Sequence, residues 1–268
     1  MNIETLVVTD LDGTLWFNGE ECHPDSLSAI DQLRNDGIPL LIATGRRLRS
    51  VTGPFHSLGI SEEAILLNGS VGYDFKNNRN FFIRTFPPTH QERLREIFAA
   101  CNLSPCFYAD DSFVYAASPT TSEGHIEAIG ADLITLEERD SFPADRQILS
   151  FCILGVDKSL LEEAESVISS EDLGSIAYYE DRLFGKHSLM VQPPSTSKWT
   201  GVKEWCAYYG VTPSKIVAVG DAGNDIELLA GADIALVIEG SEEYLLEIAD
   251  HTIPEPSEGG WAKVIEFI

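Results

Sequence analysis

The chain has 268 residues and carries 18 lysines and arginines against 43 aspartates and glutamates, a formal net charge of −25. This length allows one large domain or two modest ones, and a hydrophobic fraction of 44% excludes general disorder. With no apolar run near the roughly 20 residues of a membrane span and no signal-like start, we expect a soluble, cytoplasmic protein that, being acidic, binds neither nucleic acid nor membranes.

The first 80 residues alternate strand and helix patterns. A helical pattern begins near Pro24 and stops at Gly37. The strand-like apolar runs are residues 3–9, 38–43 and 64–67. Because these runs are continuous rather than alternating, they are typical of strands buried on both faces, as in a parallel sheet covered by helices.

The middle of the chain is richer in aromatic and β-branched segments. The predicted strands are residues 81–83, 106–108, 113–115, 149–154 and 189–191. Two helical patterns, residues 91–100 and 160–168, lie between them. Short strands mixed with helices predict an α+β unit with a largely antiparallel sheet.

The last 75 or so residues return to the alternating pattern of the first 80. Strand-like runs cover residues 216–219 and 234–238. Predicted helices cover residues 199–209, a segment starting near Asp225, residues 244–249 and residues 261–267. We therefore expect the first and last parts of the chain to form one α/β core.

Stretches rich in turn-forming residues, at 76–80 and 192–195, separate these regions. We predict an α/β fold with a Rossmann-like, doubly wound, parallel-sheet core made of residues 1–80 and 191–268. An α+β cap domain, residues 81–190, is inserted into it.

The cysteines and histidines indicate neither a disulfide scaffold nor a zinc site. The five cysteines form no C-x-x-C pair, and we expect small buried side chains in a reducing compartment. The six histidines are scattered, with no H-E-x-x-H motif.

Polar residues directly follow three of the predicted core strands. They are Asp10, Thr44 and Asp221. In an open α/β sheet, ligands bind outside the carboxyl ends of the strands, so we expect these three side chains to converge.

The first strand leads into Asp10-Leu11-Asp12-Gly13-Thr14. Carboxylates at positions i and i+2 of an extended chain lie on the same side and can supply a nucleophile and an acid/base group to one reacting centre. The structural alternative is a loop with two solvated acids and a helix cap. The buried strand before the pair and the Gly-Thr after it favour the catalytic interpretation.

Residues Gly220 to Asp225 read G-D-A-G-N-D, an oxygen-rich segment at a strand end. Acids and amides of this kind suit a hard divalent cation such as Mg²⁺. They also suit a helix cap, and the two roles are compatible.

Thr44-Gly45-Arg46 offers a hydroxyl and exposed N–H groups at a strand-to-helix turn, which is an anion site. We expect Arg47 and Arg49 to lie on a solvated helix face. Lys198 stands at a helix start, where spacing alone would indicate a surface residue.

D-L-D-G-T, A-T-G-R, a lysine opening a later helix, and G-D-x-x-N-D together resemble the four ordered motifs of the haloacid dehalogenase superfamily. The insert between the second and third motifs resembles the Cof-type phosphatases, which carry a large α/β cap. The resemblance covers the whole chain.

The resemblance implies a role for each motif residue. Asp10 would be the nucleophile that forms an aspartyl-phosphate, and Asp12 the general acid and then the general base. Substrate and phosphate would be bound by Thr44, Gly45, Arg46, Lys198 and Asn224. Mg²⁺ would be bound by Asp10, Asp12 through its carbonyl oxygen, Asp221 and, in support, Asp225.

The function that this implies is Mg²⁺-dependent hydrolysis of a small phosphorylated metabolite, such as a sugar phosphate. A sugar-phosphate phosphomutase is an alternative because such enzymes share the motifs. A phospho-aspartate signalling module would use Asp, Thr and Lys on a similar sheet, but such modules are about half this length and have no cap-sized insert. A two-metal nuclease would need a basic groove, against the net charge of −25. The sequence indicates neither the substrate nor the oligomeric state.

Overall fold

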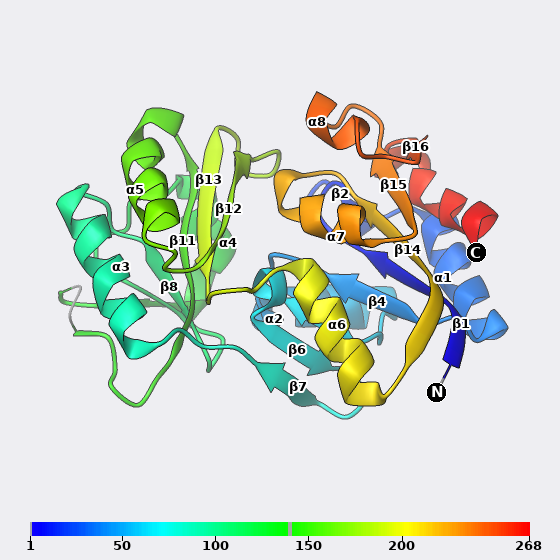
Figure 1. Ribbon diagram of the computed structural model, residues 1–268, viewed down its shortest axis with the longest axis horizontal. Helices are drawn as coiled ribbons and strands as arrows, with labels where there is room; N and C mark the ends of the chain where they lie inside the picture. Colours follow the sequence, from blue (N-terminus) through cyan, green and yellow to red (C-terminus); the bar gives the residue numbers. More distant parts are fainter. Residues whose placement is uncertain (1, 139–140) are drawn as a thin grey trace. The chain divides into compact units, whose positions relative to one another are not determined.

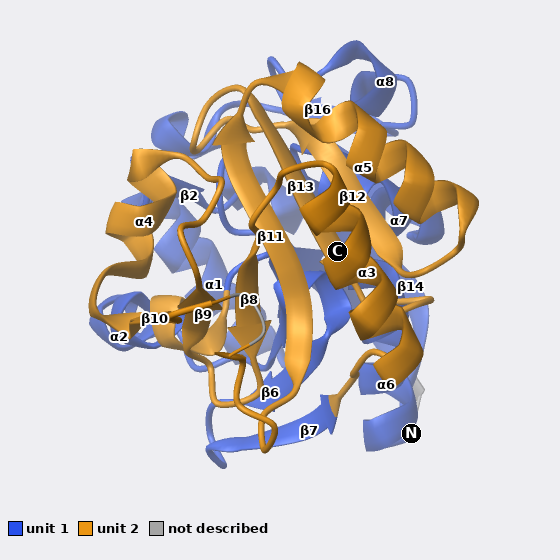
Figure 2. Cartoon of the chain, turned by 90° about the vertical axis from the view of Figure 1, so that its left-hand side faces the viewer, with its two compact units in different colours: residues 1–46, 51–82, 197–268 blue, residues 47–50, 83–196 orange. Residues whose placement is uncertain are grey.

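The computed structural model describes residues 2–138 and 141–268, which fall into two compact units. Unit 1 contains residues 1–46, 51–82 and 197–268, and unit 2 contains residues 47–50 and 83–196 (Figure 2). Apart from the short segment 47–50, the chain passes from one unit to the other at residues 82–83 and 196–197, close to the turn-rich stretches noted above.

Unit 1 is built on an eight-stranded sheet in the order β16-β15-β14-β1-β4-β5-β6-β7 (Figure 1). The strands are β1 (Asn2–Thr9), β4 (Leu40–Ala43), β5 (Ala64–Leu66), β6 (Val71–Asp74), β7 (Arg79–Ile83), β14 (Thr212–Gly220), β15 (Ile234–Ile238) and β16 (His251–Ile253). The pairings from β16 to β5 are parallel, and β6 then runs antiparallel to β5.

Helices connect and cover this sheet. They are α1 (Pro24–Asp36), α2 (Leu48–Leu58), α6 (Lys198–Tyr209), α7 (Ile226–Gly231), α8 (Glu243–Leu246) and the 3-10 helix η6 (Gly260–Phe267). Leu6 and Val8 of β1 share a core with α6 and α7, whereas α1 packs against β4 and η6. The α/β class and the doubly wound core are thus confirmed, with the first and last parts of the chain in one sheet.

The strand order places the switch point of the sheet beside β1. From β1 the chain winds outward through β4 and β5 on one side, whereas β14, β15 and β16 extend on the other. Ligand sites of doubly wound sheets lie at the carboxyl ends of the strands flanking such a point. Those ends are Thr9 for β1 and Gly220 for β14.

One predicted strand lies in a different sheet from the one expected. We expect residues 81–83 in the cap, but they form the end of β7, at the edge of the eight-stranded sheet, and the boundary between the units falls at residues 82–83. Its aromatic residues made it resemble the strands of the insert. Phe81 in fact packs with Tyr208 and Tyr209 of α6, at centroid distances of 5.4 and 6.0 Å.

Unit 2 contains a six-stranded sheet in the order β10-β9-β8-β11-β13-β12. The strands are β8 (Cys106–Ala109), β9 (Val114–Ala116), β10 (Leu133–Thr135), β11 (Ile148–Val156), β12 (Ser175–Glu180) and β13 (His187–Gln192). The pairings are antiparallel except that of β9 with β10, as predicted for a largely antiparallel sheet. The helices are α3 (Pro88–Ala100), α4 (Glu123–Ile129) and α5 (Lys158–Ser170).

Unit 2 has a hydrophobic core of its own, centred on Phe151 of β11. This ring lies 5.3 Å from Phe86, 5.8 Å from Phe98 and 5.4 Å from Phe107, measured between centroids. Leu161 of α5 completes the contact between helices and sheet and is fully buried. Because it buries this many large side chains internally, the insert is a domain rather than a long loop.

The expectation of a solvated face is wrong for Arg47. Its side chain is 6% exposed and forms an ion pair of 2.6 Å with Asp132 inside unit 2. Arg49 also pairs with Asp132, at 2.7 Å, but its side chain is 44% exposed. A charge pattern along a helix does not reveal a distant carboxylate, so sequence spacing could not separate the two arginines.

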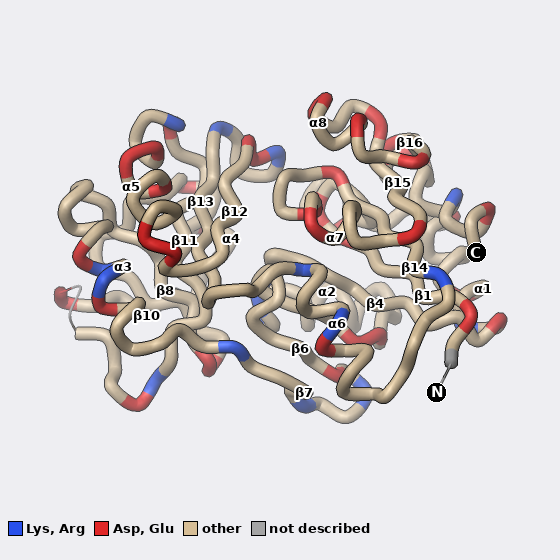
Figure 3. Tube along the Cα trace, in the orientation of Figure 1, with Lys and Arg blue, Asp and Glu red and all other residues tan. Residues whose placement is uncertain are grey.

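The remaining composition-based expectations concern charge, thiols and membranes. Acidic residues are spread along both units rather than gathered in one element (Figure 3). The five cysteines are free, and Cys106 and Cys152 are buried. Within residues 2–138 and 141–268, no helix is both long enough and apolar enough to cross a membrane.

A buried histidine lies inside unit 2. His125 of α4 is 1% exposed, and its ring nitrogens lie 2.7 Å from the hydroxyls of Tyr108 and Thr121. Burial lowers the pKa of His125 to about 4, and the charge of Arg47 adds to this shift. The folded protein therefore keeps this imidazole neutral at pH values where the unfolded chain protonates it.

The depressed pKa of His125 predicts a loss of stability in mild acid. The unfolded chain binds the proton below its ordinary pKa near 6.5, whereas the folded unit binds it only near 4, so stability falls as pH drops between these values. We expect His125→Gln to weaken the pH dependence of the unfolding free energy between pH 7.5 and pH 5 by about 2 kcal/mol. Urea unfolding at both pH values measures this.

His56→Gln, which removes an exposed histidine of α2, is the control and should leave the pH dependence of the wild type unchanged. An equal pH dependence in wild type and His125→Gln would contradict the assignment.

Candidate active site

The candidate site lies at the carboxyl ends of β14, β1 and β4, three neighbouring parallel strands. Asp221 follows β14, Asp10 follows β1 and Thr44 follows β4. These side chains are 2%, 3% and 1% exposed, respectively. The switch point of the sheet therefore brings together polar residues more than 200 positions apart in sequence.

Hydrogen bonds to β14 and, through Thr9, to η6 hold Asp10 in place. Its N–H donates to the carbonyl oxygen of Val219, at 3.0 Å, which ties the end of β1 to β14. The hydroxyl of the preceding Thr9 donates to the carbonyl oxygen of Asp10 and accepts a hydrogen bond of 2.8 Å from the indole of Trp261. Trp261 lies in η6 and is fully buried, so the C-terminal segment helps to hold the first strand.

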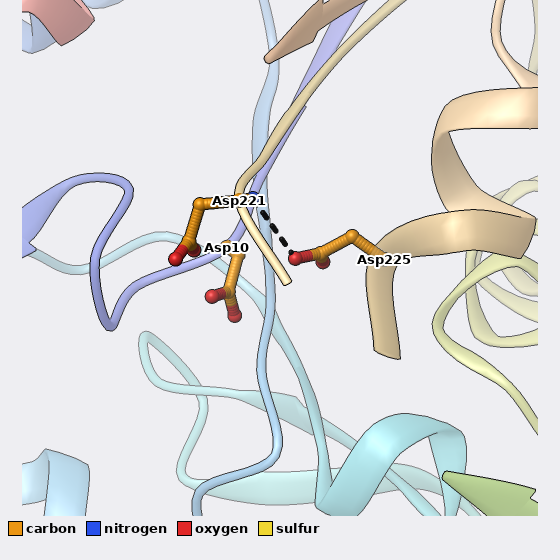
Figure 4. A group of neighbouring side chains, drawn as sticks. All are labelled: Asp10, Asp221 and Asp225. Carbon is orange, nitrogen blue, oxygen red and sulfur yellow. Dashed lines mark hydrogen bonds between the residues drawn. The ribbon is translucent and has the colours of Figure 1, made fainter. Parts of the chain in front are cut away.

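Three carboxylates converge at this point, as Figure 4 shows. Each of Asp10, Asp221 and Asp225 offers an oxygen within 4.8 Å of the others, and all three are buried. Burial raises the pKa of Asp10 well above its ordinary value, and the carboxylates of Asp225, Asp221 and Asp12 raise it further. Lys198 opposes this shift, but a single ammonium does not balance the cluster.

Lys198 is the first residue of α6 and is fully buried. The preceding Ser197 caps the helix by a reciprocal pair of hydrogen bonds with Thr200, which fixes where the helix begins. From there the ammonium donates to Oδ1 of Asp10 and to Oδ1 of Asp225, both at 2.7 Å. Burial opposes the charge of Lys198, but these two carboxylates outweigh it and raise the pKa, so the amine stays protonated.

Both carboxylate oxygens of Asp225 accept hydrogen bonds from neighbouring residues. Besides accepting from Lys198, its other oxygen accepts the N–H groups of Asp221 and Ala222 at 3.2 Å. It therefore fixes the Gly220–Asp225 turn as well as the lysine. This placement favours a supporting role near a metal ion over direct ligation.

Asp221 is oriented from the first motif. The hydroxyl of Thr14 donates to its Oδ1 at 2.7 Å. Gly13, at φ +77°, permits the close approach, since a β-carbon there would lie 2.4 Å from Oδ2 of Asp221. Glycine and threonine after the D-x-D pair thus connect β1 to β14.

Asp12 has a different environment from Asp10. Its side chain is 24% exposed and receives two hydrogen bonds of 2.7 Å from the guanidinium of Arg46. Arg46 also donates to the carbonyl oxygen of Gly19 at 2.7 Å and lies over the ring of Trp16, 5.0 Å from its centroid. The structure thus directs this arginine at Asp12 and at the β2–β3 hairpin (Trp16–Phe17 and Glu21–Cys22).

Gly45 and Asn224, the two remaining residues that the sequence predicted for the site, lie beside Asn68, which the sequence analysis did not identify. Gly45 follows Thr44, whose hydroxyl accepts from the N–H of Arg46 at 3.1 Å. The side chain of Asn224 donates from Nδ2 to Oδ1 of Asn68, at 3.1 Å. Asn68 lies two residues after the end of β5, in the 3-10 helix η1 (Leu67–Gly69), and an Asn-Gly pair directly after a buried apolar run was the signal that could have identified it.

The ligand atoms present fit a hard divalent cation. Among the residues that the structure describes, the cluster consists of carboxylates without histidine or cysteine. Asn224, in the same turn as Asp225, has a buried Oδ1 that finds no hydrogen-bond partner among those residues. The four motif carboxylates meet two cationic groups, Lys198 and Arg46. The carboxylates therefore outnumber the cationic groups, and a divalent cation would reduce this excess of negative charge.

Comparison with known proteins shows similarity to phosphatases and related hydrolases over nearly the whole chain. The family model of the haloacid dehalogenase-like hydrolases matches residues 7–265. A pyridoxal phosphate phosphatase of Escherichia coli is 24% identical over 284 residues, covering 97% of both chains. A phosphoglycolate phosphatase of Methanoculleus marisnigri is 25% identical over 260 residues, covering 97% of this chain and 94% of its own.

Solved structures confirm the fold. A haloacid dehalogenase-like hydrolase of B. subtilis superimposes with a TM-score of 0.83 at 19% identity, covering 98% of this chain and 99% of its own. A subclass IIB sugar phosphatase, BT4131, gives a TM-score of 0.77 at 18% identity, covering 99% and 98%. Because the family model spans nearly all of the sequence and the fold agrees throughout, the chain belongs to the haloacid dehalogenase-like hydrolases and is an enzyme of their Cof-type phosphatase group.

Proposed function

We propose that this protein is a Mg²⁺-dependent phosphomonoester hydrolase that acts on a small phosphorylated metabolite, such as a sugar phosphate, through an aspartyl-phosphate on Asp10. The observation that carries the proposal is the buried contact of 2.7 Å between Lys198 and Asp10 inside a cluster of carboxylates. A protonated lysine beside a buried carboxylate favours its ionised form, although here it only partly offsets burial and the neighbouring carboxylates, and it is placed to bind the anionic group that approaches.

In the first step, a carboxylate oxygen of Asp10 attacks phosphorus and the bond from phosphorus to the ester oxygen breaks. The leaving oxygen takes a proton from Asp12, whose partly exposed side chain suits a group that exchanges protons. Lys198, Thr44 and the amide of Asn224 neutralise or donate to the phosphoryl oxygens, which carry the charge in such transfers.

In the second step, water attacks the phosphorus of the aspartyl-phosphate. Asp12, now ionised, takes the proton from this water, and the bond from phosphorus to Asp10 breaks to release inorganic phosphate. Arg46 holds the Asp12 carboxylate in place through two hydrogen bonds, so the same side chain can serve in both steps.

Bound Mg²⁺ would supply Lewis acidity and charge balance at the phosphoryl group. Asp10, the carbonyl oxygen of Asp12, and Asp221 are the proposed ligands, with Asp225 in support. Thr14 and Gly13 hold Asp221 in its orientation, and Asp225 holds the turn from which it projects.

The substrate class rests on the relatives. Three relatives that match this chain over almost their whole length are named for small phosphate monoesters: pyridoxal phosphate, phosphoglycolate and 5-amino-6-(5-phospho-D-ribitylamino)uracil. This chain covers 94% or more of each of these proteins, so the same class of substrate is proposed for it.

Replacing the nucleophile should abolish hydrolysis. Asp10→Asn keeps the shape of the side chain but removes its nucleophilic charge, so we expect release of inorganic phosphate from p-nitrophenyl phosphate or a sugar phosphate to fall by roughly 10³-fold or more. Asp36→Asn, at the exposed end of α1, is the matched control and should retain wild-type turnover. Wild-type turnover in Asp10→Asn, or isomerisation of a sugar phosphate without phosphate release, would contradict the proposal.

Removing divalent metal should stop turnover reversibly. Without a cation, burial and the neighbouring carboxylates hold the pKa of Asp10 well above its ordinary value, which disfavours the nucleophilic form. We expect chelation with EDTA to eliminate phosphate release and added Mg²⁺ to restore it. Full activity after exhaustive chelation would rule out the metal requirement.

Loss of Asp12 should affect turnover far more than affinity. We expect Asp12→Ala to lower kcat for a sugar phosphate by about 10²- to 10⁴-fold with little change in KM. With p-nitrophenyl phosphate, whose leaving group needs no proton, the variant should release about one equivalent of nitrophenolate per protein and then turn over slowly. Equal changes in kcat and KM, without a burst, would be evidence against the acid/base role.

A further inference from the structure

Asn68 stands at the carboxyl end of β5, one strand beyond Thr44, and is 3% exposed. Its backbone is left-handed, with φ 51° and ψ 32°, a conformation that asparagine tolerates better than most residues. Its N–H donates to the carbonyl oxygen of Thr44 at 3.0 Å. The residue is thus attached directly to the second motif.

The side chain of Asn68 reaches the fourth motif. Its Oδ1 accepts a hydrogen bond of 3.1 Å from Nδ2 of Asn224. Gly45 lies beside this contact, and a β-carbon there would be 3.2 Å from Oδ1 of Asn68 and 3.7 Å from Nδ2 of Asn224. The absence of a side chain at Gly45 leaves room for the hydrogen bond between the two asparagines.

We propose that Asn68 is a positioning residue, which fixes the orientation of the Asn224 amide so that its second N–H is presented to a phosphoryl oxygen. This inference rests on the function proposed above. It extends the site to the fourth strand end of the sheet, β5.

The physical reason is that the two ends of a carboxamide have nearly the same shape and opposite hydrogen-bonding character. If Asn224 turned its oxygen toward a phosphoryl group, two acceptors would face each other. By accepting one N–H of Asn224, Asn68 holds the nitrogen on this side and leaves the second N–H as a donor. Charge on the phosphoryl oxygens is stabilised by donors that are already oriented before the reaction.

The test is a double-mutant cycle with Asn68→Gly and Asn224→Ala. Glycine adopts the left-handed backbone of residue 68 without strain and removes only the side chain. Asn102→Gly is the matched control, since Asn102 also has a positive φ, 55°, but is exposed at the end of α3. Thermal unfolding of each variant reports whether the fold is retained.

We expect Asn68→Gly to lower kcat for p-nitrophenyl phosphate by roughly 10-fold, the size expected for one hydrogen bond to a charged group, with a smaller effect on KM. Asn102→Gly should retain wild-type kcat. In the Asn224→Ala background, Asn68→Gly should cause no further loss, because its target is already absent. Calorimetric titration with orthovanadate should show the same pattern in affinity.

Two outcomes would overturn the inference while leaving the proposed function intact. One is wild-type kcat and orthovanadate affinity in Asn68→Gly. The other is an additive loss in the double variant, which would show that Asn68 acts independently of Asn224. If the wild type binds orthovanadate but hydrolyses no substrate, the proposed function is wrong, and the orthovanadate affinities of the variants still test the role of Asn68. If the wild type neither binds orthovanadate nor hydrolyses a substrate, the proposed function and the inference about Asn68 are both overturned.

Discussion

The buried contact of Lys198 with Asp10 and Asp225 is the interaction on which the site depends. It joins residues 188 and 27 positions apart and connects the ends of β1 and β14 to the start of α6. Burying an ammonium is unfavourable unless its partners are held in good geometry, and removing one partner of such a pair costs about 3–5 kcal/mol. Three features maintain that geometry: the helix cap at Ser197, the hydrogen bond from the N–H of Asp10 to Val219, and the turn that Asp225 holds.

The two carboxylates of the D-x-D pair differ because the chain around them differs. Asp10 is almost fully buried among acids and one lysine, whereas Asp12 keeps solvent contact and is held by Arg46. Two similar groups whose environments differ in this way are suited to separate roles, one as a nucleophile and one as a proton carrier. Arg46 holds the Asp12 carboxylate in this structure, and its binding of phosphate stays a prediction.

The motif residues and the hydrophobic core of the insert lie in different units. The motif residues and their hydrogen-bond partners belong to unit 1, while unit 2 closes its own core around Phe151 and keeps His125 neutral by burial. The short aromatic strands of the insert reflect this independent core.

The parallel core, the largely antiparallel sheet of the insert and the convergence of the motif residues could be predicted from the sequence, because apolar runs, turn formers and polar strand ends are local signals. The sequence misplaced β7, whose aromatic residues resemble those of the insert, and it missed Asn68, which a single chain offers as an ordinary Asn-Gly turn. It also placed Arg47 on a solvated face, and spacing alone would have left Lys198 on the surface had the motif resemblance not put it in the site. Burial, ion pairing and amide orientation became visible in the folded chain, because they depend on partners that lie far away along the sequence.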